Sequence, residues 1–293
     1  MYRSLGAAIA AAESQKMSLS AIALRAESED SGRTVADIRA QLGRALHIMR
    51  DAIAKGQAGD LFSASGLVGG DAAKLRKGPA GPLADTLFRD VLMRALAVQE
   101  VNAAMGVIVA APTAGGAGVL PAVLTGIAKA KQLSDDVVID GLACAGLIGA
   151  VVAERASLSG AEGGCQAETG AAAGMAAGAA TEMLGGSPRQ VGHAVALAQQ
   201  GTLGLVCDPL GGLVELPCVF RNATGAAIAL AAIEMAMAGI EFAIPADEVI
   251  DTMGEIGREM DVRYRETAGG GLAATPTGRR LAKERLVQIK RAD

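Results

Sequence analysis

Apolar residues recur every three or four positions along most of this chain, which is the spacing of a helix with one buried face. The clearest example is residues 34–53, where charged residues occupy the opposite face. Thr34 followed by Asp37 resembles a capping box and marks the start of this helix. Its apolar positions are Val35, Ile38, Leu42, Leu46, Met49 and Ile53.

The same spacing predicts a series of further helices. Residues 135–154 are apolar nearly all round, so we expect that helix to be buried. The full set of further helices covers residues 85–108, 135–154, 170–184, 189–200, 224–237, 247–260 and 278–290.

No stretch shows sustained alternation of polar and apolar residues, which a half-buried strand would require. The predicted fold class is therefore all-α, a compact Ala/Gly-rich multi-helix domain with glycine-rich loops. We expect one domain over residues 1–293, with N-terminal helices in 1–60 and the core in 61–293. The glycine-rich residues 56–81 are expected to be irregular, and the loop around Gly81 and the C-terminal tail are candidates for disorder.

One uncharged segment, residues 101–128, is long enough to cross a bilayer. It is interrupted in the middle by Pro112, Gly115, Gly116, Gly118 and Pro121. The two halves are too short to span alone, so no transmembrane helix is predicted. The N-terminal stretch MYRSLGAAIAAAESQK continues into a helical pattern rather than ending like a signal peptide, and we expect a cytoplasmic protein.

Composition adds a constraint on packing. Aromatic residues make up only 2% of the chain, Trp is absent, and there are 39 glycines. A core without large rings favours helices that approach closely through small faces. The net charge of −4 argues against nucleic-acid binding, which needs a basic surface.

The four cysteines are too few for a disulfide scaffold and are interpreted as reduced thiols. Cys165, Cys207 and Cys218 are each flanked by Gly or Pro, so each is expected at a helix or loop boundary. Cys144 lies mid-helix among apolar neighbours and is expected to act as a small hydrophobic residue.

The spacing of the three boundary cysteines leaves alternatives open. They are either three independent buried thiols or the ligands of a metal centre. Zinc is the weaker metal reading, because no C-x-x-C pair is present and no histidine is spaced to complete a site. Three thiolates without a fourth is the arrangement that leaves one iron of an iron–sulfur cluster open.

Four stretches resemble the α chain of the iron–sulfur-dependent L-serine dehydratases. They are VNAAMGVIVAAPTAGGAGVLPA, GGCQAETGAAAGMAA, GLVCDPLGGLVELPCVFRN and GGLAATPTGRRL, and they occur in the same order. The resemblance covers nearly the whole chain and is closest from about residue 64 onward. It implies a four-iron four-sulfur cluster held by Cys165, Cys207 and Cys218, and an oxygen-sensitive lyase of amino-acid catabolism and gluconeogenesis.

The reaction implied by the resemblance is elimination of water from L-serine, giving pyruvate and ammonia without pyridoxal phosphate. The open iron would act as a Lewis acid on the serine hydroxyl. If Cys165 heads the Ala/Gly helix, the helix dipole would stabilise an anionic cluster at that end.

Substrate-binding positions follow by matching. In PTAGGAG, the N–H groups around Gly115 and Gly116 and the Thr113 hydroxyl could hold a carboxylate, although the loop could equally just break a helix. Arg221 and Asn222 suit the substrate carboxylate or a cluster sulfide, with a surface salt bridge as the alternative for the arginine. Glu168 could bind the substrate amine, orient a ligand or cap a helix.

Thr275 and Thr277 could approach the same pocket or start the last helix. Phe220 stands where the family pattern suggests a lysine, which puts a catalytic cation there in doubt. The chain ends in VQIKRAD and lacks the terminal cysteine of some single-chain relatives.

No catalytic base is identified in this chain. His47 and His193 are its two histidines, neither lies in a Ser-His-Thr context, and both are expected to be structural. A separate β chain is therefore expected to bring the base, in an oligomer. Alternatives are a related lyase such as an L-cysteine desulfidase, or a non-catalytic cluster-binding protein acting as a redox sensor.

Overall fold

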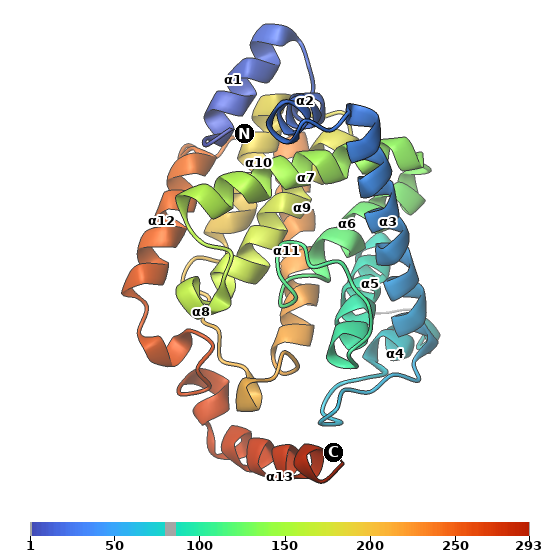
Figure 1. Cartoon of the computed structure of the whole chain (residues 1–293), viewed down its shortest axis with the longest axis vertical. Helices are drawn as coiled ribbons and strands as arrows, with labels where there is room; N and C mark the ends of the chain where they lie inside the picture. The colour runs from blue at the N-terminus through green and yellow to red at the C-terminus, as the bar shows by residue number, and fades with distance from the viewer. Residues whose placement is uncertain (1, 80–85, 293) are drawn as a thin grey trace.

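The computed structural model describes residues 2–79 and 86–292. The thirteen α-helices of the described chain form one helical body, with α1 and α13 at opposite ends (Figure 1). The helices are α1 (Leu5–Gln15), α2 (Leu19–Ser31), α3 (Val35–Ala58), α4 (Asp71–Lys77), α5 (Thr86–Ala103), α6 (Val119–Lys131), α7 (Asp135–Arg155), α8 (Gly160–Gly163), α9 (Ala171–Met183), α10 (Pro188–Gln200), α11 (Cys218–Met237), α12 (Ala246–Glu259) and α13 (Pro276–Ala292).

The all-α prediction is confirmed, since the described residues contain one isolated β-bridge and no strand. Each helix predicted from periodicity is present. The Thr34 cap is also present, because its hydroxyl accepts a hydrogen bond from the Asp37 N–H at 3.1 Å. The loop around Gly81 lies outside the described residues.

Some predicted helix limits were wrong, and one helix was missed. Helix α5 ends at Ala103, five residues early, where Met105 takes a positive φ. Helix α11 begins at Cys218 rather than at residue 224. The glycine-rich region contains α4, whose first N–H groups, those of Asp71 and Ala72, donate to the buried Glu100 carboxylate of α5.

Helix α9 is the centre of the fold and is buried along almost its whole length. It packs against α6, α7, α10 and α11 (Figure 1). Small residues make this possible: a Cβ at Gly178 would lie 2.5 Å from Ile148 Cδ1, and one at Gly174 would lie 2.8 Å from Gln199 Cγ. The predicted close approach of Ala/Gly faces is thus present.

A π-helical turn, Gln166–Gly170, precedes α9. Its widened turn is visible in the bond that the Ala171 N–H donates to the Gln166 carbonyl, five residues back. Gln166 fixes the turn to its surroundings, because its Nε2 donates to the Met253 carbonyl at 3.0 Å and its Oε1 accepts from the Gly204 N–H at 2.8 Å. The spacing of apolar residues does not predict this turn.

The N-terminal helices are anchored to the core by two carboxylates. Asp247 of α12 accepts hydrogen bonds from the N–H of Leu5 and the hydroxyl of Ser4, each at 2.8 Å. Glu182 of α9 accepts from the N–H of Leu19 at 2.7 Å. Each carboxylate satisfies backbone donors that a helix N-terminus leaves free.

The uncharged segment 101–128 divides into the end of α5, a loop and α6. Pro112 and the three glycines lie in the loop, as predicted, but Pro121 does not break a helix. It occupies the third position of α6, where a backbone N–H would have no intrahelical partner.

By length and composition alone, α7 and α11 are the two described helices that could cross a membrane. The apolar windows of these helices are 61% and 44% buried within the protein, respectively. A buried core helix meets the same criterion, and α7 is one, with Cys144 and Ile148 inaccessible to solvent.

The contact of α3 with α5 generates a stability test. A Cβ at Gly56 would lie 2.1 Å from the Ala97 carbonyl oxygen, and backbone cannot move aside as a side chain can. We expect Gly56→Ala to lower the free energy of unfolding by about 2 kcal/mol, measured by urea denaturation. Gly43→Ala in the same helix meets only Ile139 Cδ1 at 3.6 Å and should stabilise by about 0.5–1 kcal/mol. Equal effects at the two positions would contradict the packing of α3 on α5.

Candidate metal centre

Cys165, Cys207 and Cys218 come from three segments that are distant in the sequence, and all three are buried free thiols. Cys165 lies between α8 and the π-helical turn, and its Sγ is 3.1 Å from the Thr169 hydroxyl. Cys218 is the first residue of α11. The predicted positions at helix and loop boundaries are confirmed.

Cys207 lies in the extended segment after α10 and is held by residues close to the C-terminal helix. Its N–H donates to the Tyr264 carbonyl and its carbonyl accepts from the Glu266 N–H, both at 2.8 Å. This parallel bridge is the only extended pairing among the described residues. It ties the Cys207 segment to the chain between α12 and α13.

The thiols interact with one another electrostatically. Burial raises the pKa of Cys207 well above its ordinary value, and the nearby Cys165, Glu168 and Cys218 raise it further. Burial, followed by Cys165 and Glu168, raises the pKa of Cys218 to about 12, while Arg221 opposes this shift. The pKa of Cys165 is also raised by burial. The thiols therefore stay protonated near neutral pH unless a positively charged group offsets their repulsion.

Glu168, in the middle of the π-helical turn, is the carboxylate of this site. Its Oε1 accepts a hydrogen bond from the Thr113 hydroxyl at 2.7 Å, and its Oε2 lies 3.9 Å from Cys207 Sγ. Only 8% of the residue is exposed, and burial raises its pKa. Thr113 and Glu168, two positions selected from the sequence, are thus in direct contact beside the thiols.

Glycines at three positions leave room for Glu168, two of them beside its carboxylate and one beside its backbone carbonyl. A Cβ at Gly115 would lie 2.6 Å from Oε1, and one at Gly160 would lie 2.5 Å from Oε2. A Cβ at Gly116 would lie 2.8 Å from the Glu168 carbonyl oxygen. Gly116 therefore allows two backbones to approach closely, and Gly115 leaves room for the Glu168 carboxylate. These are separate roles from the anion binding expected of their N–H groups.

Asn222 is fully buried and has hydrogen bonds at both ends of its amide. Its Nδ2 donates to the carbonyls of Gly115 at 2.6 Å and Cys218 at 2.9 Å, and its Oδ1 accepts from the Gly118 N–H at 2.9 Å. Asn222 therefore joins the glycine loop to the first turn of α11. Its contact with a substrate stays a prediction.

Arg221 holds the Cys207 segment. Its Nη1 donates to the Val206 carbonyl at 2.8 Å, and its Nη2 forms an ion pair with Asp208 at 2.7 Å. Asp208 in turn accepts from the Leu272 N–H at 2.6 Å. This is a buried ion pair rather than the surface one considered above, and its contact with a substrate likewise stays a prediction.

The donor chemistry fits a metal group larger than one ion. No three His, Cys, Asp or Glu side chains of the described chain are close enough together to hold a single metal ion. The three thiols are nevertheless buried, mutually repulsive when ionised, and within electrostatic reach of each other. Buried cysteine thiolates are the donors that an iron–sulfur cluster uses, so the residues present fit such a group.

The remaining candidates lie outside this constellation. Cys144 is buried in the apolar core of α7, as predicted. His47 is exposed on α3 beside Asp51, and His193 accepts a hydrogen bond from the Phe242 N–H through Nδ1. Thr275 starts the last helix, because its hydroxyl accepts from the Gly278 N–H at 3.0 Å.

The sequence did not reveal the roles of Gly160 and Asp208, or the bridge between Cys207 and residues 264–266. Asp208 stands between Cys207 and Pro209. An acidic residue next to an expected buried cysteine was a signal that Asp208 is itself buried and paired with a cation. No local pattern predicts that the residues after α12 return to pair with Cys207. Such long-range pairing depends on the tertiary fold.

The fold and the site define an all-helical protein with a buried three-thiol centre. A model of the family described as "Serine dehydratase alpha chain" matches residues 14–273. The chain is 47% identical over 97% of its length to the "Probable L-serine dehydratase, alpha chain" of Bacillus subtilis, of which it covers 95%. It is 52% identical over 66% of its length to the protein of that name in Latilactobacillus sakei, of which it covers 92%.

A longer relative is also similar. The chain is 43% identical over 87% of its length to the "L-serine dehydratase" of Streptomyces coelicolor, but it spans only 57% of that protein. The chain belongs to the serine dehydratase alpha chain family.

Asn222 allows a test of how the site is assembled. Asn222→Ala leaves a buried N–H and two carbonyls without their partner, so we expect the free energy of unfolding to fall by about 2–3 kcal/mol. Thr224→Ala, two residues further along α11 at an exposed position, is the matched control and should change stability little. An equally mild effect of both substitutions in thermal unfolding would show that the amide does not hold the loop.

Proposed function

We propose that this chain is the α subunit of an iron–sulfur L-serine dehydratase that eliminates water from L-serine to give pyruvate and ammonia. The observation that carries the proposal is the convergence of three buried thiols on Glu168 in a chain of this family. The names of the relatives supply the substrate.

Cys165, Cys207 and Cys218 would hold a four-iron four-sulfur cluster. When bound, this group supplies an iron without a protein ligand, which acts as a Lewis acid on the serine hydroxyl. Arg221 lies near enough to lower the pKa of Cys165 and Cys218, so its charge favours the thiolate forms that bind metal.

Glu168 and Thr113 are proposed to bind the substrate. A carboxylate in a buried site attracts an ammonium group strongly, because the low dielectric screens the charge poorly. The hydrogen bond from Thr113 fixes the orientation of Oε1, which leaves Oε2 toward Cys207. We assign Glu168 to the amino group of serine and the N–H groups of the glycine loop to its carboxylate.

The base that removes the α proton is proposed to come from a separate β chain. His47 is exposed on α3 beside Asp51, and the Nδ1 of His193 accepts a hydrogen bond from the Phe242 N–H, so we assign the base to neither histidine. The Bacillus and Latilactobacillus relatives are named as α chains, and the chain spans only 57% of the Streptomyces protein. The assembly would work in the cytoplasm, where thiols stay reduced.

Metal loading tests the ligand assignment. After anaerobic reconstitution with iron and sulfide, we expect about four irons per chain in the unsubstituted protein. Cys207→Ser should abolish cluster assembly, whereas Cys144→Ser replaces an equally buried thiol of the core and should leave loading nearly intact. Iron analysis and absorption spectra provide the readout, and equal loss in both variants would contradict the assignment.

Activity tests the division of labour between the chains. The loaded chain should form little pyruvate from L-serine alone and become active when a β chain is added. Substituting Glu168→Gln should raise KM for L-serine, because the ammonium group of the substrate loses its counter-charge. The iron content should stay nearly unchanged. Pyruvate formation from L-cysteine but not from L-serine would overturn the choice of substrate. Full activity without a partner would overturn the proposed β-chain base.

A further inference from the structure

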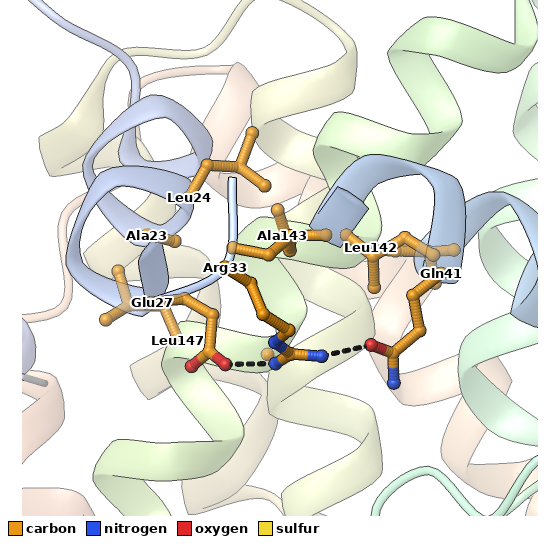
Figure 2. A pocket seen from close by; sticks show the side chains of 11 residues that line it. Ala23, Leu24, Glu27, Arg33, Gln41, Leu142, Ala143 and Leu147 are labelled. Carbon is orange, nitrogen blue, oxygen red and sulfur yellow. Dashed lines mark hydrogen bonds and ion pairs between the residues drawn. The ribbon is translucent and has the colours of Figure 1, made fainter. Parts of the chain in front are cut away.

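Cavities with charged linings occur at several places on the described protein, and in three of them the charges neutralise each other. The first, of about 220 Å³, lies between α2, α3 and α7. Arg33 crosses its mouth between Glu27, at 2.5 Å, and Gln41 (Figure 2). The guanidinium is therefore satisfied within the protein and requires no ligand.

The same holds for two other cavities. Arg189 in the cavity between α1 and α10 pairs with Glu13 at 2.7 Å. Arg25 beside Tyr2 pairs with Glu29 at 3.8 Å. In these cavities each cation has an acidic partner that lines the same space.

A fourth cavity, of about 390 Å³, lies between α8, the end of α7 and α12, and its two cations are unpaired. Arg258 and Arg265 line it, and neither guanidinium has an ion pair or hydrogen bond to the described residues. The Nε of Arg265 is moreover buried without a partner. A buried charged donor without an acceptor is costly, so it indicates a group that the protein alone does not supply.

The nearby acidic residues do not supply it. Glu162 lines the cavity, but its Oε2 accepts a hydrogen bond from the Ser157 hydroxyl at 2.6 Å. Asp261 forms its ion pair with Arg263 at 3.0 Å. Asp261 interacts with Arg265 through its charge, without a hydrogen bond to it. The cavity lining itself contains two arginines and one glutamate, which leaves a formal charge of +1.

We propose that this cavity binds a small oxyanion, a carboxylate or phosphate group held between Arg258 and Arg265. The planar guanidinium fork matches the two oxygens of either group, whereas a spherical anion uses the fork less well. The glycine at position 254 leaves space at the cavity wall, since a Cβ there would lie 3.3 Å from Arg258 Nη1.

The site is distinct from the three-thiol centre but shares a wall with it. Gly163 and Ala167 line the cavity and flank Cys165 in the sequence. Arg265 is also the residue bridged through its backbone to Cys207. A bound oxyanion would therefore connect α12 with the segments that carry two of the three thiols, and would stabilise both.

Titration calorimetry on the reduced, metal-free 293-residue chain tests this proposal, with inorganic phosphate and pyruvate as separate probes at constant ionic strength. We expect saturable one-to-one binding of at least one probe. Arg265→Gln and Arg258→Gln should each weaken it by about tenfold or more, because each removes a charged hydrogen bond. Arg44→Gln, at an exposed position of α3, is the matched control and should bind as the unsubstituted chain does.

Tighter binding of phosphate than of pyruvate would identify a phosphate site, and the reverse order a carboxylate site. If Arg265→Gln does not fold, Arg265→Lys keeps the charge without the fork and should show the same loss in weaker form. Absence of saturable binding by both probes would overturn the proposal. So would pyruvate binding that is lost in Cys207→Ser and kept in Arg265→Gln, because it would place the anion at the thiols.

Discussion

The close packing of the glycine loop and α8 around Glu168 is the constraint on which this structure depends. Gly115, Gly116 and Gly160 each stand where a single methyl group would overlap Glu168. At Gly116 the added methyl would meet backbone, and overpacking of that kind costs about 1–3 kcal/mol, a large fraction of the stability of a domain. At Gly115 and Gly160 the Glu168 carboxylate would have to move from its place. The site therefore exists only because the helices that carry these loops can come unusually near to one another.

The composition of the core follows from that requirement. Helix α9 continues directly from the π-helical turn. Its Ala and Gly residues let α7, α10 and α11 pack closely around it. Larger side chains would push α11, and with it Cys218, away from Cys165. The scarcity of aromatic residues is thus linked to the geometry of the thiols, because large rings between the helices would move the cysteines apart.

The helices and the identity of the site residues were largely predictable, whereas their local roles were not. Periodicity located α3 because its two faces differ in polarity, and Thr34 marked the start of that helix directly. Helix α7 was located by its length and its nearly continuous apolar character. Periodicity missed α4, because that helix is stabilised by Glu100 from α5 and not by its own pattern. Asn222 was selected as a substrate ligand, which stays a prediction, but its hydrogen bonds to three backbone groups were not foreseen. The bridge from Cys207 to Arg265 joins residues 58 positions apart. Contacts of this range leave no trace in local spacing.

The π-helical turn between Cys165 and α9 has a consequence for how this protein can change over time. Each helical residue turns the chain by about 100° around the helix axis. Inserting or deleting one residue therefore rotates all side chains before that point relative to those after it. Loss of a single residue from Gln166–Gly170 would restore regular α-helical bonding. Cys165 would then swing away from the other two thiols. Evolution can substitute side chains in this segment one at a time, but the length of the segment is constrained. We therefore expect no insertions or deletions here among homologous chains.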